Sequence, residues 1–285
     1  MIFLKKLISP IIIILFLVLS FYYTNKSVAI LKNADPIMKE IKNTEEKYTI
    51  SPIDAQIVGD NIISGKNGKT IDYEKSYNKM KRYGTYNESL TALKDLKPVI
   101  SIKDNYDKYI VSGNKNNRNI SLVFTVKENE NIETILNILD KKNVTATFFL
   151  DGSYLEKNIN TIKNIKNHEL EILSYNNQFE ETFIKTSISY LNSITNKNSK
   201  YCYTEENNDN ILNTCKKLKL HTVKPTLVLK KDIYKEIKNN LSNSIVSLEV
   251  NNYVIKELSP TIDYLLKKGY NVISLDSVIR EGNEY

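Results

Sequence analysis

The sequence predicts an α/β fold in which a barrel-like (β/α)7 domain follows a small α+β module and an N-terminal transmembrane helix. Three observations lead to this prediction. Apolar strand-like runs alternate with amphipathic helices over residues 119–285, which is typical of a parallel sheet with helical crossovers. Residues 51–118 carry shorter β-like runs around one helix. Residues 1–29 contain an apolar stretch that approaches the length of a bilayer span.

The N-terminal segment has the charge pattern of a signal anchor. Lys5 and Lys6 precede the apolar stretch Leu7–Tyr23, and basic residues before such a stretch favour an inside amino terminus. We therefore expect a single-pass protein of the cell membrane with its bulk extracytoplasmic. A signal peptide stays open as the alternative, because Ser27-Val28-Ala29 has small residues at the −3 and −1 positions. Cleavage after Ala29 would give a secreted protein.

Charge and composition exclude several classes of function. The net charge is +7 without a run of Lys or Arg, so we expect no nucleic-acid partner and a mild attraction to anionic lipid or wall polymers. The only two cysteines, Cys202 and Cys215, cannot make a disulfide framework. Two histidines, His168 and His221, are very few for a site with imidazole ligands.

Residues 30–50 are predicted to form a short helix or a stalk rather than a core element, because their apolar residues are scattered among many charges. In the module of residues 51–118, Ile57–Ile63 is predicted to be a strand. The pair Asn67-Gly68 after it indicates a type I′ hairpin turn. A helix with Tyr73, Tyr77 and Met80 should follow, then strands at Pro98–Ile102 and Tyr109–Val111.

The domain of residues 119–285 should contain seven strands. They are predicted at Ile120–Phe124, Val144–Leu150, Glu169–Ser174, Lys200–Tyr203, Thr222–Leu229, Ile245–Val250 and Tyr270–Leu275. Among the helix boundaries, Ser153 and Glu156 have the spacing of a capping box, Ser259-Pro260 is predicted to open the last long helix, and Gly269 to end it. Function in such barrels collects at the carboxyl ends of the strands.

Four segments occur in a characteristic order. They are Leu122-Val-Phe-Thr-Val-Lys127, Val144-Thr-Ala-Thr-Phe-Phe-Leu150, Asn167-His-Glu-Leu170 and the closing helix and strand of residues 261–276. In this order the sequence, from about Asn119 to Arg280, resembles the polysaccharide deacetylases that carry the NodB homology domain. The resemblance implies a NodB-type barrel and, for the family, metal-assisted hydrolysis of N-acetyl groups on cell-surface glycans. In that chemistry an Asp and two His of an H-x-x-x-H motif hold the metal, and a neighbouring Asp is the base.

The catalytic pattern of the family fails in this chain. Carried over by the resemblance, the base position is Thr125, the metal-ligand Asp position is Val126, and the two His positions are Leu173 and Asn177. Valine and leucine have no donor atoms, and one neutral amide cannot hold a divalent ion. We therefore expect no metal, no cofactor and a catalytically inactive relative of the family.

An active enzyme stays open as the alternative. It would be a hydrolase of carbon–nitrogen bonds other than peptide bonds in N-acetylated polysaccharide, acting through non-standard carboxylates. Glu249 stands where the family motif supplies an acid histidine, and with Glu128 or Glu130 it would form the carboxylate pair.

The predicted partner is a cell-wall glycan or another envelope protein. Tyrosines and amides suit sugars, because they combine flat apolar area with neutral hydrogen-bonding groups. The candidate ligand-binding residues follow the third and fourth strands of the domain and are Tyr175, Asn176, Asn177, Gln178, Tyr201 and Tyr203, with Lys127 and Glu128 after the first strand.

The remaining histidines and cysteines have plain structural interpretations. His168 is interpreted as a turn residue before a strand, and His221 begins a strand without a partner motif. Cys215 shares an apolar helix face and is interpreted as a small buried residue. Cys202 is expected to be accessible at a strand end, and a Cys202–Cys215 disulfide is left open rather than predicted.

Overall fold

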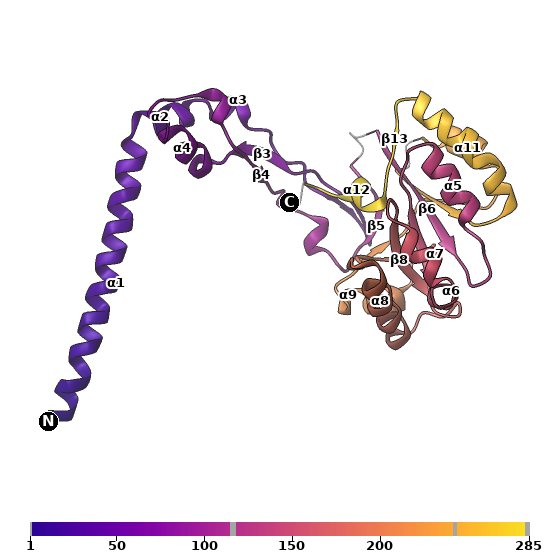
Figure 1. Cartoon of the computed structure of the whole chain (residues 1–285), viewed down its shortest axis with the longest axis horizontal. Helices are drawn as coiled ribbons and strands as arrows, with labels where there is room; N and C mark the ends of the chain where they lie inside the picture. The colour runs from indigo at the N-terminus through magenta and orange to yellow at the C-terminus, as the bar shows by residue number, and fades with distance from the viewer. Residues whose placement is uncertain (1, 115–117, 242–243, 283–285) are drawn as a thin grey trace. The chain divides into compact units, whose positions relative to one another are not determined.

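The structure is a computed structural model that describes residues 2–114, 118–241 and 244–282 (Figure 1). It divides into two compact units, one made of Met1–Ser51 and Gly68–Leu96, the other of Pro52–Asn67 and Lys97–Tyr285. This division differs from the sequence boundaries at residues 51 and 118. The reason is that the strand at 61–63 pairs with the strand at 109–112, which in turn pairs with the strand at 221–223.

The first unit begins with α1 (Ile2–Ala34), a single helix of 33 residues. Its stretch Ile14–Ala34 is long and apolar enough to cross a membrane, and none of it is buried against the rest of the chain. The predicted N-terminal apolar helix is thus confirmed. A signal sequence near an amino terminus has the same character.

The rest of the first unit packs around its own small core. Its elements are α2 (Pro36–Asn43), α3 (Glu45–Tyr48), β3 (Gly68–Ile71), α4 (Tyr73–Lys81), the short helix η1 (Glu88–Leu90) and β4 (Leu93–Leu96). Ile37 and Ile41 of α2 are buried against Ile71 and Met80. The short-helix alternative is therefore the right one for this segment. The expectation that it is not a core element is wrong, because one face of α2 has a packing partner in α4 that local sequence does not reveal.

Two local predictions for residues 51–118 are also wrong. The hairpin joins β1 (Gln56–Val58) to β2 (Asn61–Ile63) through Gly59, whose φ of 61° suits a tight turn. Asn67-Gly68 instead leads into β3, which pairs with β4. Residues 98–102 do not form a strand; they end at η2 (Ile102–Asp104), while the predicted strand at 109–111 is present as β5 (Tyr109–Ser112).

The second unit contains two sheets. One has the order β11-β12-β6-β7-β8, with β13 also paired to β6, and the other has the order β1-β2-β5-β10-β9. The strands are β6 (Asn119–Val126), β7 (Thr147–Asp151), β8 (Glu169–Ser174), β9 (Tyr201–Tyr203), β10 (His221–Val223), β11 (Leu227–Leu229), β12 (Ile245–Glu249) and β13 (Asn271–Val272). All ladders of the first sheet are parallel, which confirms the α/β barrel-like class.

The predicted strand Thr222–Leu229 is in fact two strands that belong to different sheets. β10 ends at Val223 and β11 begins at Leu227, and Pro225 lies between them. Proline lacks the N–H that a ladder needs, so a central strand cannot continue through it.

The two faces of the first sheet enclose different cores. Helices cover its outer face, and Leu122, Phe124 and Val126 of β6 are buried on that side. Val123, on the other face of β6, packs with Phe149 and with residues of the second sheet. The helices of this unit are α5 (Glu133–Lys141), α6 (Gly152–Lys157), α7 (Ile159–Asn164), α8 (Glu181–Thr195), α9 (Asp209–Lys217), α10 (Ile233–Asn239), α11 (Asn252–Lys267) and α12 (Leu275–Ile279).

Of three helix-boundary predictions, two are wrong and one is confirmed. The N-cap of α6 is Asp151, whose side chain accepts from the Ser153 N–H, so the Ser153–Glu156 capping box is wrong by two residues. α11 begins at Asn252, and Pro260 lies inside the helix instead of opening it. Gly269 follows the end of α11 with φ 78°, as predicted for a terminating glycine.

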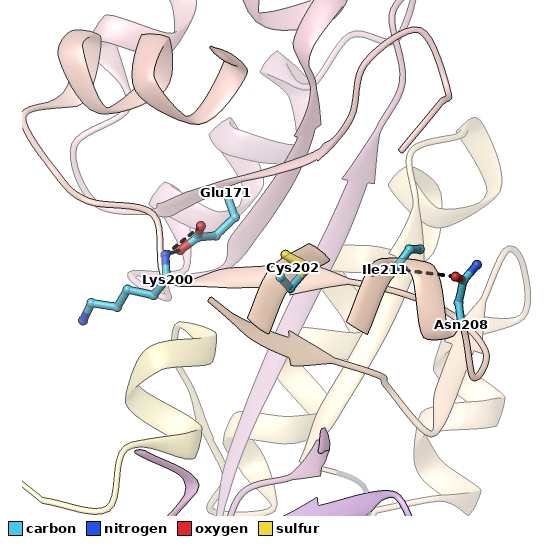
Figure 2. Close-up of a disulfide and its surroundings, with 6 residues drawn as sticks. Glu171, Lys200, Cys202, Asn208 and Ile211 are labelled. Atoms are coloured by element: carbon cyan, nitrogen blue, oxygen red, sulfur yellow. Dashed lines mark hydrogen bonds between the residues drawn. A yellow bond between two sulfur atoms is a disulfide. The ribbon is translucent and has the colours of Figure 1, made fainter. Parts of the chain in front are cut away.

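A disulfide joins Cys202 on β9 to Cys215 on α9 (Figure 2). Both residues are buried, and Leu220 packs with them. The expectation that Cys202 is accessible is therefore wrong, because α9 covers the outer side of β9.

We predict that reduction of the Cys202–Cys215 disulfide lowers the free energy of unfolding by about 3 kcal/mol, because the unfolded chain regains the freedom of the closed loop. Chemical denaturation of the full-length chain with and without reductant measures the change. The Cys202→Ala/Cys215→Ala variant is the control, and reductant should not change its stability. Equal stability of the oxidised and reduced wild type would contradict the prediction.

Candidate functional site

The carboxyl ends of β6, β8, β9 and β12 form the mouth of the barrel. Thr125, near the end of β6, lies in register with Glu249 on one side and Phe149 on the other. A groove of about 630 Å³ opens at the ends of β8 and β9. It is lined by Leu173, Ser174, Asn177, Phe179, Tyr203, Thr204, Glu205, Glu206, Asn208 and Ile211. Barrels of this class place their sites at this end, so the groove is the candidate functional site.

The four positions that the deacetylase resemblance singles out do not fit a metal. Val126 is fully buried in the core on the helix side, and Thr125 is buried between its neighbouring strands. Leu173 and Asn177 line the groove. Of these side chains, only the Thr125 hydroxyl and the Asn177 amide carry an oxygen. Within the described part of the chain, no cluster of three His, Cys, Asp or Glu residues has a geometry that holds a metal ion.

Asp151 holds the loop on which Asn177 lies, and the sequence analysis missed it. Its fully buried carboxylate accepts hydrogen bonds from the Ser174 hydroxyl at 2.6 Å and from the backbone N–H groups of Asn176 and Asn177 at 3.0 Å. It also accepts from the N–H and the hydroxyl of Ser153. Asn176 and Asn177 both have positive φ, which asparagine tolerates. An Asp directly before a helix indicates an N-cap, but it does not indicate the contact with the loop of Asn177.

The pKa of Asp151 is lowered from its ordinary value. Burial alone would raise it, but the hydrogen bonds from Ser153, Ser174 and Asn177 favour the ionised carboxylate more strongly. At neutral pH the ionised Asp151 therefore accepts the hydrogen bonds that hold the loop of Asn177 at the edge of the groove.

The carboxylates proposed for an alternative catalytic pair are engaged with lysines. Glu249 lies 3.0 Å from Lys127 Nζ and 3.7 Å from Lys230 Nζ. Glu130 accepts a hydrogen bond from the Lys127 N–H at 2.7 Å, and burial raises its pKa. The Glu249 hydrogen bond raises the pKa of Lys127. Glu128 pairs with Lys157, away from Glu249.

Four of the six predicted ligand-binding residues do not line the groove, and a fifth, Tyr203, is mostly buried. The Tyr203 side chain lines the groove, but it is mostly buried and its hydroxyl lies 2.7 Å from Ser247 Oγ. Tyr175 stacks on Phe183 with ring centroids 5.3 Å apart. Asn176 and Gln178 are exposed on the same loop. Among the six predicted residues, only Asn177 and Tyr203 line the groove.

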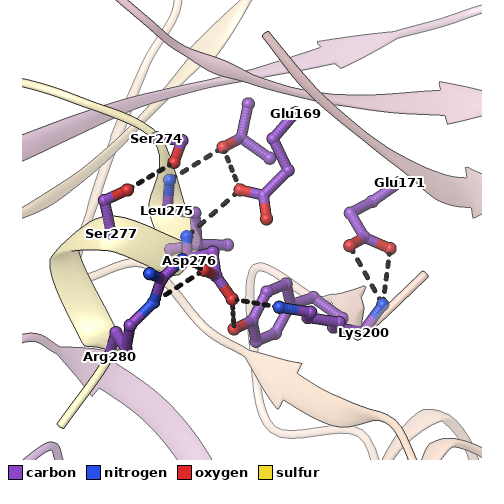
Figure 3. A network of polar contacts seen from close by, with 10 residues as sticks. Glu169, Glu171, Lys200, Ser274, Leu275, Asp276, Ser277 and Arg280 are labelled. Atoms are coloured by element: carbon purple, nitrogen blue, oxygen red, sulfur yellow. Dashed lines mark hydrogen bonds and ion pairs between the residues drawn. The ribbon is translucent and has the colours of Figure 1, made fainter. Parts of the chain in front are cut away.

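Tyr201 belongs to the opposite end of the barrel, which corrects its assignment to the site. Its buried hydroxyl donates to Asp276 at 2.9 Å, and Lys200 Nζ and the Arg280 guanidinium bind the same carboxylate (Figure 3). The Asp276 N–H donates to Glu169 Oε2 at 3.1 Å. These residues lie at the amino ends of β8 and β9, where polar networks stabilise a barrel and do not act on substrate.

The two histidines contact neighbouring parts of the fold and do not line the groove. His168 is buried, and its Nδ1 accepts a hydrogen bond from the Ala146 N–H at 3.2 Å, which fixes the turn before β8. His221 stacks on Tyr106 with ring centroids 4.1 Å apart. Burial lowers the pKa of His221 to about 4, so the ring stays neutral at pH 7.

The parallel sheet and the mouth at its carboxyl ends are typical of a barrel-like α/β domain. Residues 112–239 match the family Polysaccharide deacetylase. This part of the chain is therefore similar to a polysaccharide deacetylase domain.

A curated relative covers part of the chain. The uncharacterized protein YlxY of Bacillus subtilis (strain 168) is 31% identical over 156 residues, which are 53% of this chain and 48% of YlxY. The match thus spans about half the length of that relative.

Solved structures share the fold over a longer part of the chain. BA3943, a CE4 family pseudoenzyme from Bacillus anthracis, has a TM-score of 0.66 and 23% identity over 88% of this chain and 97% of that one. A BA3943 mutant with restored enzymatic activity has a TM-score of 0.66 and 22% sequence identity. The match covers 88% of this chain and 100% of that one. A family 4 carbohydrate esterase from Bacillus anthracis has a TM-score of 0.51 and 21% sequence identity. The match covers 59% of this chain and 85% of that one. At these identities the likeness shows the NodB-type fold alone.

We predict that Asp151→Asn lowers the free energy of unfolding at pH 7 by about 2 kcal/mol, because an amide cannot accept all the hydrogen bonds of the carboxylate. Because the folded-state pKa is lowered, this contribution is full above about pH 4 and is lost as the pH falls further. Urea denaturation between neutral and acid pH measures it. The control is Asp263→Asn at an exposed carboxylate paired with Lys142, which should change stability by less than about 0.5 kcal/mol. A difference from wild type that grows toward acid pH would contradict the prediction.

Proposed function

We propose that this chain is a membrane-anchored, extracytoplasmic protein whose deacetylase-like domain does not catalyse and whose mouth binds a cell-wall glycan. One observation carries the proposal. The groove at the ends of β8 and β9 persists, while Leu173 and Asn177, at the family's two histidine positions, form part of its lining. The surface that would receive a glycan is thus retained without the chemistry that would act on it.

The lining of the groove suits a sugar. The half-buried Phe179 offers aromatic surface, and Asn177 and Asn208 offer amides. Flat apolar area beside neutral hydrogen-bonding groups is the combination that a sugar ring requires. The Asn208 side chain accepts from the Ile211 N–H at 3.1 Å, so α9 holds it in place (Figure 2). Another envelope protein is the remaining candidate occupant.

Loss of catalysis is supported by the residues at the mouth. Thr125, Val126, Leu173 and Asn177 replace the expected base and ligands, and Glu249 is bound between two lysines. The structure of similar fold from Bacillus anthracis is called a CE4 family pseudoenzyme, in agreement with this proposal.

The extracytoplasmic placement has two supports. α1 contains an apolar stretch of sufficient length, and a disulfide joins Cys202 to Cys215. Disulfides persist in oxidising compartments and are rare in the cytosol. Recovery of Cys202 and Cys215 as free thiols from cells quenched with an alkylating reagent would contradict this placement.

We predict that the full-length chain in detergent binds wall-glycan fragments without releasing acetate. Ile211→Trp should abolish binding, because the larger side chain fills the groove from α9. The control is Leu266→Trp on the exposed side of α11, which should bind like the wild type. Calorimetry measures binding, and an enzymatic acetate assay on the same samples measures turnover. Acetate release would favour the carboxylate-hydrolase alternative, and absence of binding would direct the search to a protein partner.

We further predict that the wild type retains no stoichiometric zinc and that a variant with Thr125→Asp, Val126→Asp, Leu173→His and Asn177→His gains it. Val126 lies in the core, so this variant should lose stability, and circular dichroism must show that it is folded. The control is the same variant without Asn177→His, which should hold zinc less tightly. Elemental analysis gives the result. A folded variant that takes up no zinc, or a wild type that retains one zinc per chain, would overturn the assignment of these positions.

A further inference from the structure

The groove has a charge opposite to that of the whole chain. The sequence has 40 basic and 33 acidic residues, for a net charge of +7. The groove lining nevertheless includes two carboxylates, Glu205 and Glu206, and no Lys, Arg or His. A ligand for this groove therefore meets negative charge on a protein that is positive overall.

Both carboxylates are available to a ligand. Glu205 and Glu206 are exposed, directly after β9. Over residues 2–114, 118–241 and 244–282, neither carboxylate has an ion-pair partner; Glu205 Oε1 has only a long contact of 3.5 Å to the Tyr203 hydroxyl. Their charge is thus not neutralised within the described chain.

The lysines around the mouth have partners other than the two groove carboxylates. Lys127 is close enough for Glu205 to raise its pKa slightly, but its main partner is Glu249 at 3.0 Å. Lys230 pairs with the same carboxylate at 3.7 Å. Lys224 Nζ donates to Asn207 Oδ1 at 2.5 Å, next to Glu206 in the sequence. Among the described residues, none of these three lysines forms an ion pair with Glu205 or Glu206.

We propose that the groove selects glycans whose amino groups are free and protonated over the N-acetylated forms of the same glycans. This inference rests on the proposed function, because it names the chemical class of the glycan. An ammonium group on a sugar ring that packs against Phe179 donates charge-assisted hydrogen bonds to Glu205 and Glu206. An N-acetyl group at the same place is neutral and brings a carbonyl oxygen toward the carboxylates. The chain thus recognises the product class of deacetylation.

The test compares matched ligands on the full-length chain in detergent. Chitosan pentamers, with free amines, and chitin pentamers, with N-acetyl groups, have the same length and backbone. At about pH 6, where the amines are largely charged, we expect the chitosan pentamer to bind about tenfold or more tightly, with an affinity that falls as salt rises. Glu205→Gln/Glu206→Gln should remove the preference. Glu40→Gln/Glu46→Gln removes the same charge from exposed sites of the first unit and should leave it unchanged.

The outcomes separate this inference from the proposed function. Absence of binding to both pentamers overturns both. Equal binding, tighter binding of chitin, or a preference that survives Glu205→Gln/Glu206→Gln overturns the selectivity and leaves glycan binding in place. A lysine tripeptide should compete weakly, because it lacks the sugar ring. Competition equal to that of the chitosan pentamer would show that the groove binds charge alone and would also overturn the inference.

Discussion

The structure depends on the burial of β6 on both faces. Leu122, Phe124 and Val126 face the helices, and Val123 faces the interior shared with the second sheet. β6 pairs with β7, β12 and β13, so these strands take their register from it. A strand buried in this way tolerates charge only at its end, and in this chain that end carries Thr125 and Val126. The loss of the metal site is thus compatible with an undisturbed core.

Each end of the barrel carries its own cluster of hydrogen-bonded polar side chains. At the amino ends of the strands, Asp276 binds Lys200, Tyr201 and Arg280, and buried Glu171 accepts the Lys200 N–H at 3.0 Å. Burial raises the pKa of Glu171 well above its ordinary value, because desolvation disfavours the charged carboxylate. At the carboxyl ends, Asp151 stays ionised and orders the loop beside the groove. The polar cluster at the amino ends is therefore separate from the residues that border the groove.

An ammonium group lies among the carboxylates at the mouth. Lys127 Nζ lies 3.0 Å from Glu249, and the Lys127 N–H donates to Glu130. An ammonium group compensates for carboxylates but does not activate water as a metal does. Among the described residues Glu205 and Glu206 have no ion-pair partner, which gives the groove a negative lining.

The sequence alone determined the alternation of strands and helices, the apolar N-terminal helix, and the absence of metal donors at Val126 and Leu173, because these follow from local pattern and from side-chain chemistry. The tertiary structure decided what depends on contacts between distant segments. β2 and β5 complete the second sheet, α9 brings Cys215 to Cys202, and Asp151 reaches Asn177 across 26 residues. The hydrogen bond from the Tyr201 hydroxyl to Asp276 also joins segments that are distant in the sequence. Such pairings are set by the packing of whole elements, which leaves no signature in the residues on either side.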